Sequence, residues 1–133
     1  MNTTRYRTAQ LDMALQSPGS VLVDVREPHE LVSDGYVRGA LNIPVRTLES
    51  VATSSRRSLG WPSTPIVVFC RSGNRSSHAA RVLRDIGYSH VVNAGTWRDV
   101  AHALAAHGAA LERGRVVPAT AGTNTASNSI NIW

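Results

Sequence analysis

Cysteine, lysine, aromatic residues and long apolar runs are all scarce or missing in this sequence. The one cysteine, Cys70, excludes an intramolecular disulfide and a metal cluster built on four cysteines. No segment approaches the roughly 18 apolar residues of a membrane-spanning helix, so we expect no membrane partner. Residues 1–16 lack the apolar stretch of a secretory signal, and together with the lone thiol this predicts a cytoplasmic protein.

Lysine is absent, so all 14 cationic side chains are arginines, and the net charge is +5. A basic balance of this size raises nucleic acid as a partner. The arginines are scattered along the chain, however, with Arg56 and Arg57 as the densest cluster, and aromatic residues make up only 5% of the sequence. No nucleic-acid recognition motif is visible. The composition therefore favours the attraction of small anions over nucleic-acid binding.

A chain of 133 residues with 42% hydrophobic side chains has the size and composition of one compact domain. We assign this domain to residues 1–117. Residues 118–133 carry no charged side chain and consist mostly of Ala, Thr, Asn, Ser and Gly. A segment of this composition buries little apolar surface, so we expect a flexible C-terminal tail. The oligomeric state is not indicated by any feature of the sequence.

Short β-branched apolar runs, continuous rather than alternating, predict strands that are buried on both faces. They occupy residues 21–25, 66–69 and 91–92. Apolar residues at helical spacing predict helices around these strands. They cover residues 8–16, 46–59, 75–86 and 96–107. Gly87 is expected to end the third of these helices, and Thr96 to cap the start of the fourth. Strands that alternate with helices predict an α/β fold with a central parallel sheet flanked by helices on both faces.

The chemistry is concentrated where the second of these strands ends, at Cys70. A short loop, Arg71-Ser72-Gly73-Asn74, follows the cysteine, and a helix is expected to begin at about Arg75. Backbone N–H groups of such a loop, the positive end of the helix dipole and two arginines all favour a thiolate over a thiol. A buried, inert thiol at the end of a core strand is the alternative, but the cations on both sides of the loop favour a nucleophile that serves an anionic substrate.

Four segments in order resemble the rhodanese-like sulfurtransferases. The loop Cys-Arg-Ser-Gly-Asn-Arg-Ser at residues 70–76 resembles the active-site loop of that family, and Val-Asp-Val-Arg-Glu-Pro-His-Glu at residues 23–30 resembles its first signature. Residues 35–44 and 94–97 resemble two further family stretches, so that the resemblance covers about residues 8–117. Tyr36 stands where the family usually has histidine, and Ala94 replaces the first glycine of a turn.

The resemblance implies a rhodanese-like fold and a sulfur transfer in two steps. Cys70 would take the outer sulfur of an anionic donor such as thiosulfate as a persulfide, and cyanide or a cellular thiol would then remove it. No second cysteine can resolve the persulfide, so the acceptor must be external, and neither a cofactor nor a metal is required. The expected substrate-binding residues are those of the loop and of the helix start: Arg71, Ser72, Gly73, Asn74, Arg75 and Ser76.

Asp24 and Arg26 are supporting candidates, because Asp24 ends the first strand at the same edge of the sheet as Cys70. Asp24 would accept hydrogen bonds from the loop or pair with an arginine; a structural tie between the strand and its crossover is the alternative. Arg26 and Glu30 have the spacing of a pair on a helix surface, worth a few tenths of a kcal/mol.

Other functions on the same fold stay open at this stage. A phosphatase or arsenate reductase also uses a cradled thiolate, but phosphatase relatives carry one residue more between the cysteine and the arginine. The loop from Cys70 to Arg75 has four intervening residues, a size that suits a single sulfur atom. A non-catalytic protein-binding module usually lacks the cysteine. Sulfur transfer to one dedicated acceptor protein stays open as well.

Overall fold

The computed structural model describes residues 2–54 and 59–117, and its backbone alternates strands with helices as predicted. In chain order the elements are α1 (Asn2–Leu15), β1 (Val21–Asp24), α2 (Pro28–Asp34), β2 (Leu41–Asn42), α3 (Val45–Ser54), β3 (Ile66–Cys70), α5 (Asn74–Ile86), β4 (Val91–Thr96), α6 (Trp97–His107), β5 (Leu111–Glu112) and β6 (Arg115–Val116). The expected tail, residues 118–133, lies outside the described residues, as does part of the helix predicted over 46–59.

The centre of the sheet is parallel, as the sequence predicts. Strand β1 pairs in parallel with β3 and β2, and β3 pairs in parallel with β4. An antiparallel hairpin, β5–β6, extends the sheet beyond β1 and gives the order β4-β3-β1-β6-β5. The hairpin was not predicted, because its strands are two residues each. Its turn residues, Arg113 and Gly114, both have positive φ, as a tight hairpin turn requires.

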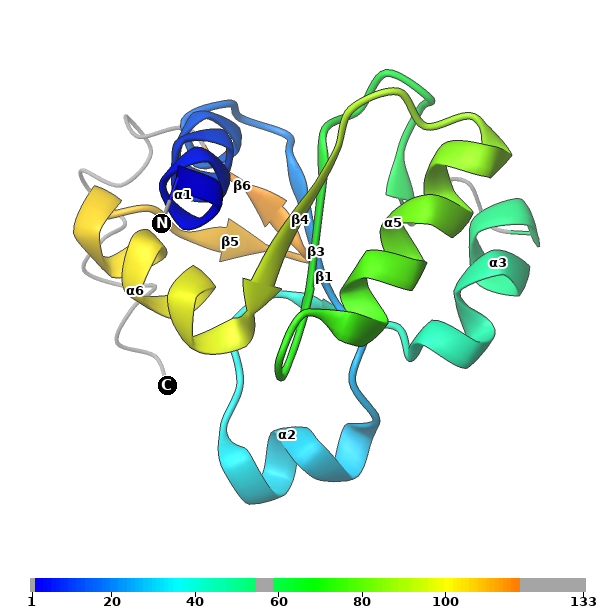
Figure 1. Ribbon diagram of the computed structural model, residues 1–133, viewed down its shortest axis with the longest axis horizontal. Coiled ribbons are helices and arrows are strands. Elements are labelled where there is room, and N and C mark those ends of the chain that lie inside the picture. The colour runs from blue at the N-terminus through cyan, green and yellow to red at the C-terminus, as the bar shows by residue number, and fades with distance from the viewer. Residues whose placement is uncertain (1, 55–58, 118–133) are drawn as a thin grey trace.

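Helices cover both faces of the sheet (Figure 1), with α3 and α5 on one side and α1 and α6 on the other. Side chains of β3 alternate between the two resulting cores. Ile66, Val68 and Cys70 face α3 and α5, whereas Val67 and Phe69 face α1 and α6. All five side chains are fully buried, so the strand reads as one continuous apolar run. Cys70 is therefore the last core position on the α5 side of the sheet.

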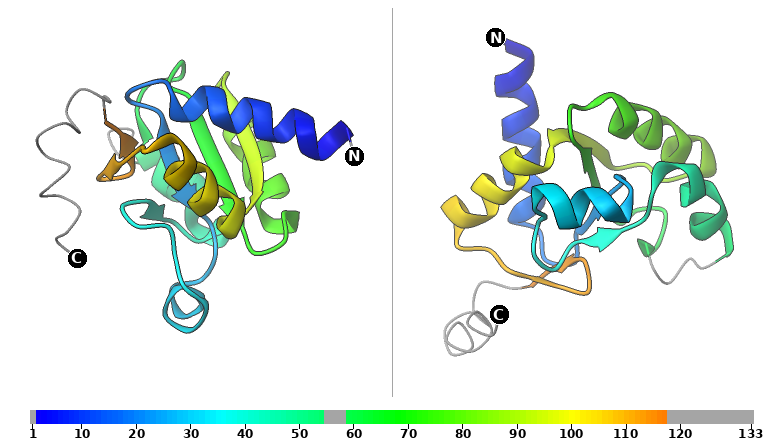
Figure 2. Two further views of the ribbon diagram at one scale, coloured as in Figure 1. Left: turned by 90° about the vertical axis from the view of Figure 1, so that its left-hand side faces the viewer. Right: turned by 90° about the horizontal axis from the view of Figure 1, so that it is seen from below.

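Helix α2 lies apart from these layers, beyond the end of the sheet where β1 finishes (Figures 1 and 2). None of its residues is buried, and Val32 is 89% exposed. Polar contacts hold it instead. Arg26 donates a hydrogen bond to the carbonyl oxygen of Gly35 just after the helix (2.8 Å), and Arg46 of α3 forms a two-pronged contact with Glu27 just before it. Its position therefore depends on charge more than on apolar packing.

Gly35 ends α2 in a conformation that only glycine adopts easily, with φ of +113°, and it lies against Trp97. A Cβ added here would come within 2.8 Å of Trp97 Cη2, whereas Gly87, with φ of +122°, has open space around it. Gly35→Ala should destabilise the fold by about 2–4 kcal/mol through strain plus the clash, and Gly87→Ala by about 1 kcal/mol through strain alone. Urea unfolding of both variants measures the difference in the free energy of unfolding. Equal losses of stability would show that the Trp97 ring moves aside without an energetic cost.

Candidate active site

The sulfur of Cys70 lies at the carboxyl end of β3, in the turn that leads into α5. The backbone N–H of Gly73 donates a hydrogen bond to Cys70 Sγ over 3.0 Å, and the hydroxyl oxygen of Ser76 lies 3.3 Å from the same sulfur. Gly73 has φ of +103°, a left-handed conformation that lets the loop fold back toward the sulfur. The sequence predicted this strand–loop–helix arrangement, and α5 begins one residue earlier than expected, at Asn74.

Two opposing effects act on the ionisation of Cys70. Burial of the sulfur raises the pKa of the thiol, because it disfavours the charged form. A charged sulfur can accept hydrogen bonds from the Ser76 hydroxyl and from the backbone N–H groups of Ser76, Gly73 and Ser72, and these bonds lower the pKa. The hydrogen bonds outweigh burial, so the pKa of Cys70 lies below its ordinary value of 9.0. The loop therefore favours the thiolate through hydrogen bonds, among them those from the backbone N–H groups that were expected from the sequence.

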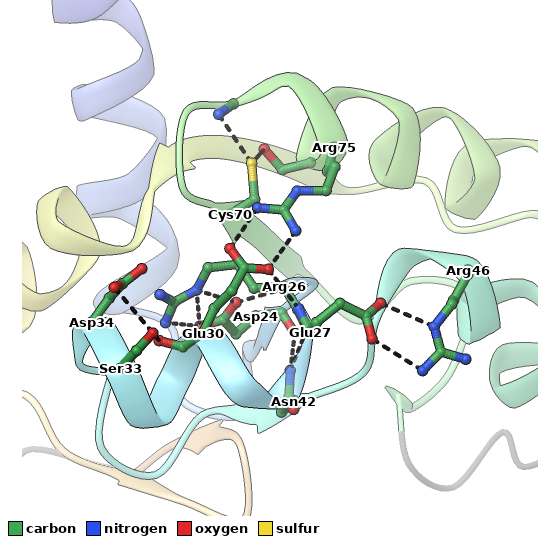
Figure 3. A network of polar contacts seen from close by, with 12 residues as sticks. Asp24, Arg26, Glu27, Glu30, Ser33, Asp34, Asn42, Arg46, Cys70 and Arg75 are labelled. Carbon is green, nitrogen blue, oxygen red and sulfur yellow. Dashed lines mark hydrogen bonds and ion pairs between the residues drawn. The ribbon is translucent and has the colours of Figure 1, made fainter.

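Arg75 is bound to a carboxylate rather than directed at a free anion site. Its two terminal nitrogens donate to both oxygens of Glu30 in α2, at 2.6 and 2.9 Å. The guanidinium of Arg75 holds the pKa of Glu30 at about 2, against an ordinary value of 4.5. This pair anchors α2 to the start of α5, which explains how a helix without buried side chains keeps its place (Figure 3).

The other loop side chains form the rim of the site. Arg71, Ser72 and Asn74 are exposed, and Arg71 makes no side-chain hydrogen bond or ion pair with any residue that the structure describes. Ser76 is different: its side chain is fully buried beneath the loop. The residues expected to bind substrate therefore fall into three groups. Arg71, Ser72 and Asn74 are exposed, Arg75 is paired with Glu30, and only Gly73 and Ser76 place a polar group against the sulfur.

Asp24 and Arg26 form a buried ion pair at the end of β1. Two guanidinium nitrogens of Arg26 and its backbone N–H donate to the Asp24 carboxylate, the shortest contact being 2.7 Å. The guanidinium also lies over the Trp97 ring, 4.8 Å from its centroid. Asp24 thus pairs with an arginine, as one expectation from the sequence had it, and this pair also ties the strand to its crossover. The expected surface pair of Arg26 with Glu30 was wrong, because Glu30 bonds to Arg75 instead.

Asn93 of β4 was missed from the sequence. Its side-chain oxygen accepts hydrogen bonds from the Ser76 hydroxyl (2.7 Å) and from the backbone N–H of Gly95 (3.0 Å). The strand register shifts here: Asn93 pairs with Val68, Gly95 with Phe69, and Ala94 is the extra residue of a bulge. A bulge changes the direction of nearby side chains. The only sequence signal was an asparagine within an apolar strand, two residues before a glycine.

Three further observations concern metal-binding groups, membrane-spanning helices and Tyr36. Within residues 2–54 and 59–117, no three His, Cys, Asp or Glu side chains come together as a metal-binding group. In the same ranges no helix is long and apolar enough to cross a membrane. Tyr36 is 56% exposed, so it does not occupy a buried place beneath the loop.

The contact between Glu30 and Arg75 predicts an acid-dependent loss of stability. Because the folded state lowers the pKa of Glu30 to about 2, the pair stabilises the fold fully above about pH 4.5 and loses this effect as the pH falls toward 2. Glu30→Gln should therefore cost about 1 kcal/mol at pH 7 and flatten the dependence of stability on pH between 4.5 and 2. Glutamine still accepts the hydrogen bond from the backbone N–H of Glu27.

Urea unfolding between pH 2 and 7 tests this prediction. Glu49→Gln is the matched control, since Glu49 is an exposed glutamate of α3 that forms no ion pair in the described part of the chain. An unchanged pH dependence in Glu30→Gln would show that the pair does not stabilise the fold.

Comparison with known proteins identifies the family of this chain. Residues 8–101 match the model of the rhodanese-like domain family. The thiosulfate sulfurtransferase PspE of Escherichia coli is 35% identical over 80 residues, which cover 59% of this chain and 72% of the relative. The human thiosulfate:glutathione sulfurtransferase is 34% identical over 100 residues, with coverage of 68% and 86%.

Solved structures show the same relationship. The human single-domain sulfurtransferase TSTD1 has a TM-score of 0.54 at 32% identity, over 60% of this chain and 79% of that one. A rhodanese of E. coli solved with anions has a TM-score of 0.51, also at 32% identity, over 62% and 92%. The chain belongs to the rhodanese-like domain family, as its sequence resemblance indicated.

Proposed function

We propose that this protein transfers a sulfane sulfur from an anionic donor such as thiosulfate to a thiophilic acceptor, through a persulfide on Cys70. The chain is a rhodanese-type enzyme, and matched relatives carry the name thiosulfate sulfurtransferase. The observation that supports the persulfide route is the hydrogen bond from the Gly73 N–H to the Cys70 sulfur, in a loop that favours the thiolate. A group that stabilises a thiolate also stabilises the anionic persulfide that replaces it.

In the first step the Cys70 thiolate attacks the outer sulfur of thiosulfate. A new S–S bond forms at Cys70, the S–S bond of the donor breaks, and its electron pair leaves with sulfite. In the second step cyanide or a thiolate attacks the outer sulfur of the persulfide, and the Cys70 thiolate leaves. The charge balances in both steps, and no oxidant, reductant or metal takes part.

Arg71 is the cation that we assign to capture of the donor. It is exposed beside the loop and makes no ion pair among residues 2–54 and 59–117. Arg75 also lies close enough to feel the charge of Cys70, but its guanidinium is engaged by Glu30. We therefore propose that Arg75 contributes mainly by holding the loop and α2 in place, whereas Arg71 attracts the dianion.

The acceptor is external, since Cys70 is the only cysteine in the chain. A small thiol is the acceptor that we favour, because the relative matched over 68% of this chain is named for glutathione. A dedicated acceptor protein would meet the same sulfur across the same rim. The lone thiol is suited to a reducing compartment, and on that ground we propose the cytoplasm as the location.

Cys70→Ser should abolish sulfur transfer and leave the fold intact, because serine keeps the size of the side chain but lacks the nucleophile. Intact-protein mass spectrometry after incubation with thiosulfate should show a gain of one sulfur atom on the wild type only, reversed by cyanide. No adduct on folded wild-type protein with a free thiol would contradict the persulfide and leave oxyanion chemistry or a binding role.

Arg71→Ala should raise the KM for thiosulfate about 3- to 10-fold at low ionic strength, with kcat changed much less, because the arginine acts on the approach of the anion. The effect should shrink as salt screens the charge. Arg81→Ala, which removes an exposed arginine from α5 away from the loop, controls for net charge. Equal KM values for the two variants would remove Arg71 from donor binding.

A further inference from the structure

The buried hydroxyl of Ser76 has two polar neighbours and only one proton to give. Its oxygen lies 3.3 Å from Cys70 Sγ and 2.7 Å from Asn93 Oδ1. A serine hydroxyl donates one hydrogen bond and accepts through its lone pairs. Ser76 can therefore donate to the sulfur or to Asn93, but not to both at once.

The orientation of the Asn93 amide decides which contact is made in the structure. The backbone N–H of Gly95 can only donate, and it points at the same side-chain atom of Asn93 that faces Ser76, over 3.0 Å. That atom must be the oxygen, so the Ser76 hydroxyl must donate to it. The lone pairs of Ser76 then face the sulfur, an arrangement that suits a Cys70 S–H donor and thus the neutral thiol.

A thiolate needs the opposite arrangement, because it accepts hydrogen bonds and donates none. When Cys70 loses its proton to solvent, Ser76 keeps its own proton but must turn it from Asn93 to the sulfur. We propose that Asn93 is a positioning residue that holds the Ser76 proton away from Cys70 in the neutral enzyme, so that forming the thiolate requires breaking the Ser76–Asn93 hydrogen bond. This inference rests on the proposed role of Cys70 as the nucleophile.

The burial of Ser76 strengthens the competition between Cys70 and Asn93 for its proton. Ser76 is fully buried, so water does not readily replace the contact that its hydroxyl gives up. The charged groups around Cys70 come from other elements: Arg75 from α5, with Glu30 of α2 and Asp24 of β1 near it, and Arg71 in the loop. None of them contacts Asn93 in the described part of the chain, so a change at Asn93 leaves them in place.

The test measures the pKa of Cys70 from the pH dependence of its alkylation by iodoacetamide, without any sulfur donor. Asn93→Leu keeps a side chain of similar size but removes the competing acceptor. We expect the pKa of Cys70 to fall by about half a unit to one unit, the equivalent of one modest hydrogen bond. In the Ser76→Ala background the same substitution should leave the pKa unchanged.

This double-mutant comparison separates the proposal from a structural role of Asn93 in the bulge. A shift of equal size with and without the Ser76 hydroxyl would overturn it, as would no shift or an upward shift in Asn93→Leu alone. Alkylation requires only a thiol, so the result does not depend on whether the persulfide forms.

A measurement without any substitution at Asn93 decides the matter if Asn93→Leu does not fold. In the otherwise unchanged protein, the ¹³Cγ resonance of Asn93 should titrate with the pKa of Cys70, because Oδ1 loses a hydrogen bond when the thiolate forms. In Ser76→Ala the charge on the sulfur still appears, but the shift should be much smaller. A resonance that does not move with Cys70, or that moves equally in both proteins, would contradict the proposal.

Discussion

The site depends on one constraint. Strand β3 is buried on both faces and ends at Cys70, and the loop that follows turns back toward the sulfur of this residue. Cys70 is the last core position of β3, and Gly73 allows the loop to direct its N–H at the sulfur over 3.0 Å. Burial alone would favour the neutral thiol. The loop therefore has to offset the loss of hydration with hydrogen bonds that the sheet and α5 hold in place, and it lowers the pKa of Cys70 overall.

Charged residues of alternating sign form a row of ion pairs beside the sulfur. Asp24 binds Arg26, and Glu30 binds Arg75 at the start of α5 (Figure 3). Each cation is matched by a carboxylate, so the row fixes α2 and the loop without leaving a buried charge unpaired. For function we propose a division of roles, in which the paired Arg75 maintains the geometry and the exposed Arg71 attracts the incoming anion.

Much of the fold follows from local pattern. The continuous apolar run of β3, the apolar stripe of α5 and the cap of α6, where Thr96 accepts a hydrogen bond from the Asp99 N–H, were all predicted, because each depends on neighbours a few residues away. Most helix and strand ends moved by a few residues, but α1 begins at Asn2 rather than at residue 8, and α2 was not predicted. The hairpin β5–β6 was missed because a pair of residues shows no periodicity.

By itself the sequence determined the class of sheet, the place of Cys70 at its carboxyl edge and the loop that surrounds the sulfur. Only the tertiary structure decided which partners its polar side chains take. Arg75 meets Glu30 across 45 residues of sequence, and Ser76 meets Asn93 across 17. Such contacts depend on how α2 and the bulge of β4 pack against α5, and no spacing rule within one helix or strand encodes them. The position of Cys70 in its loop is therefore a local property, whereas the hydrogen-bond partners of Ser76 and Arg75 around it are a property of the assembled fold.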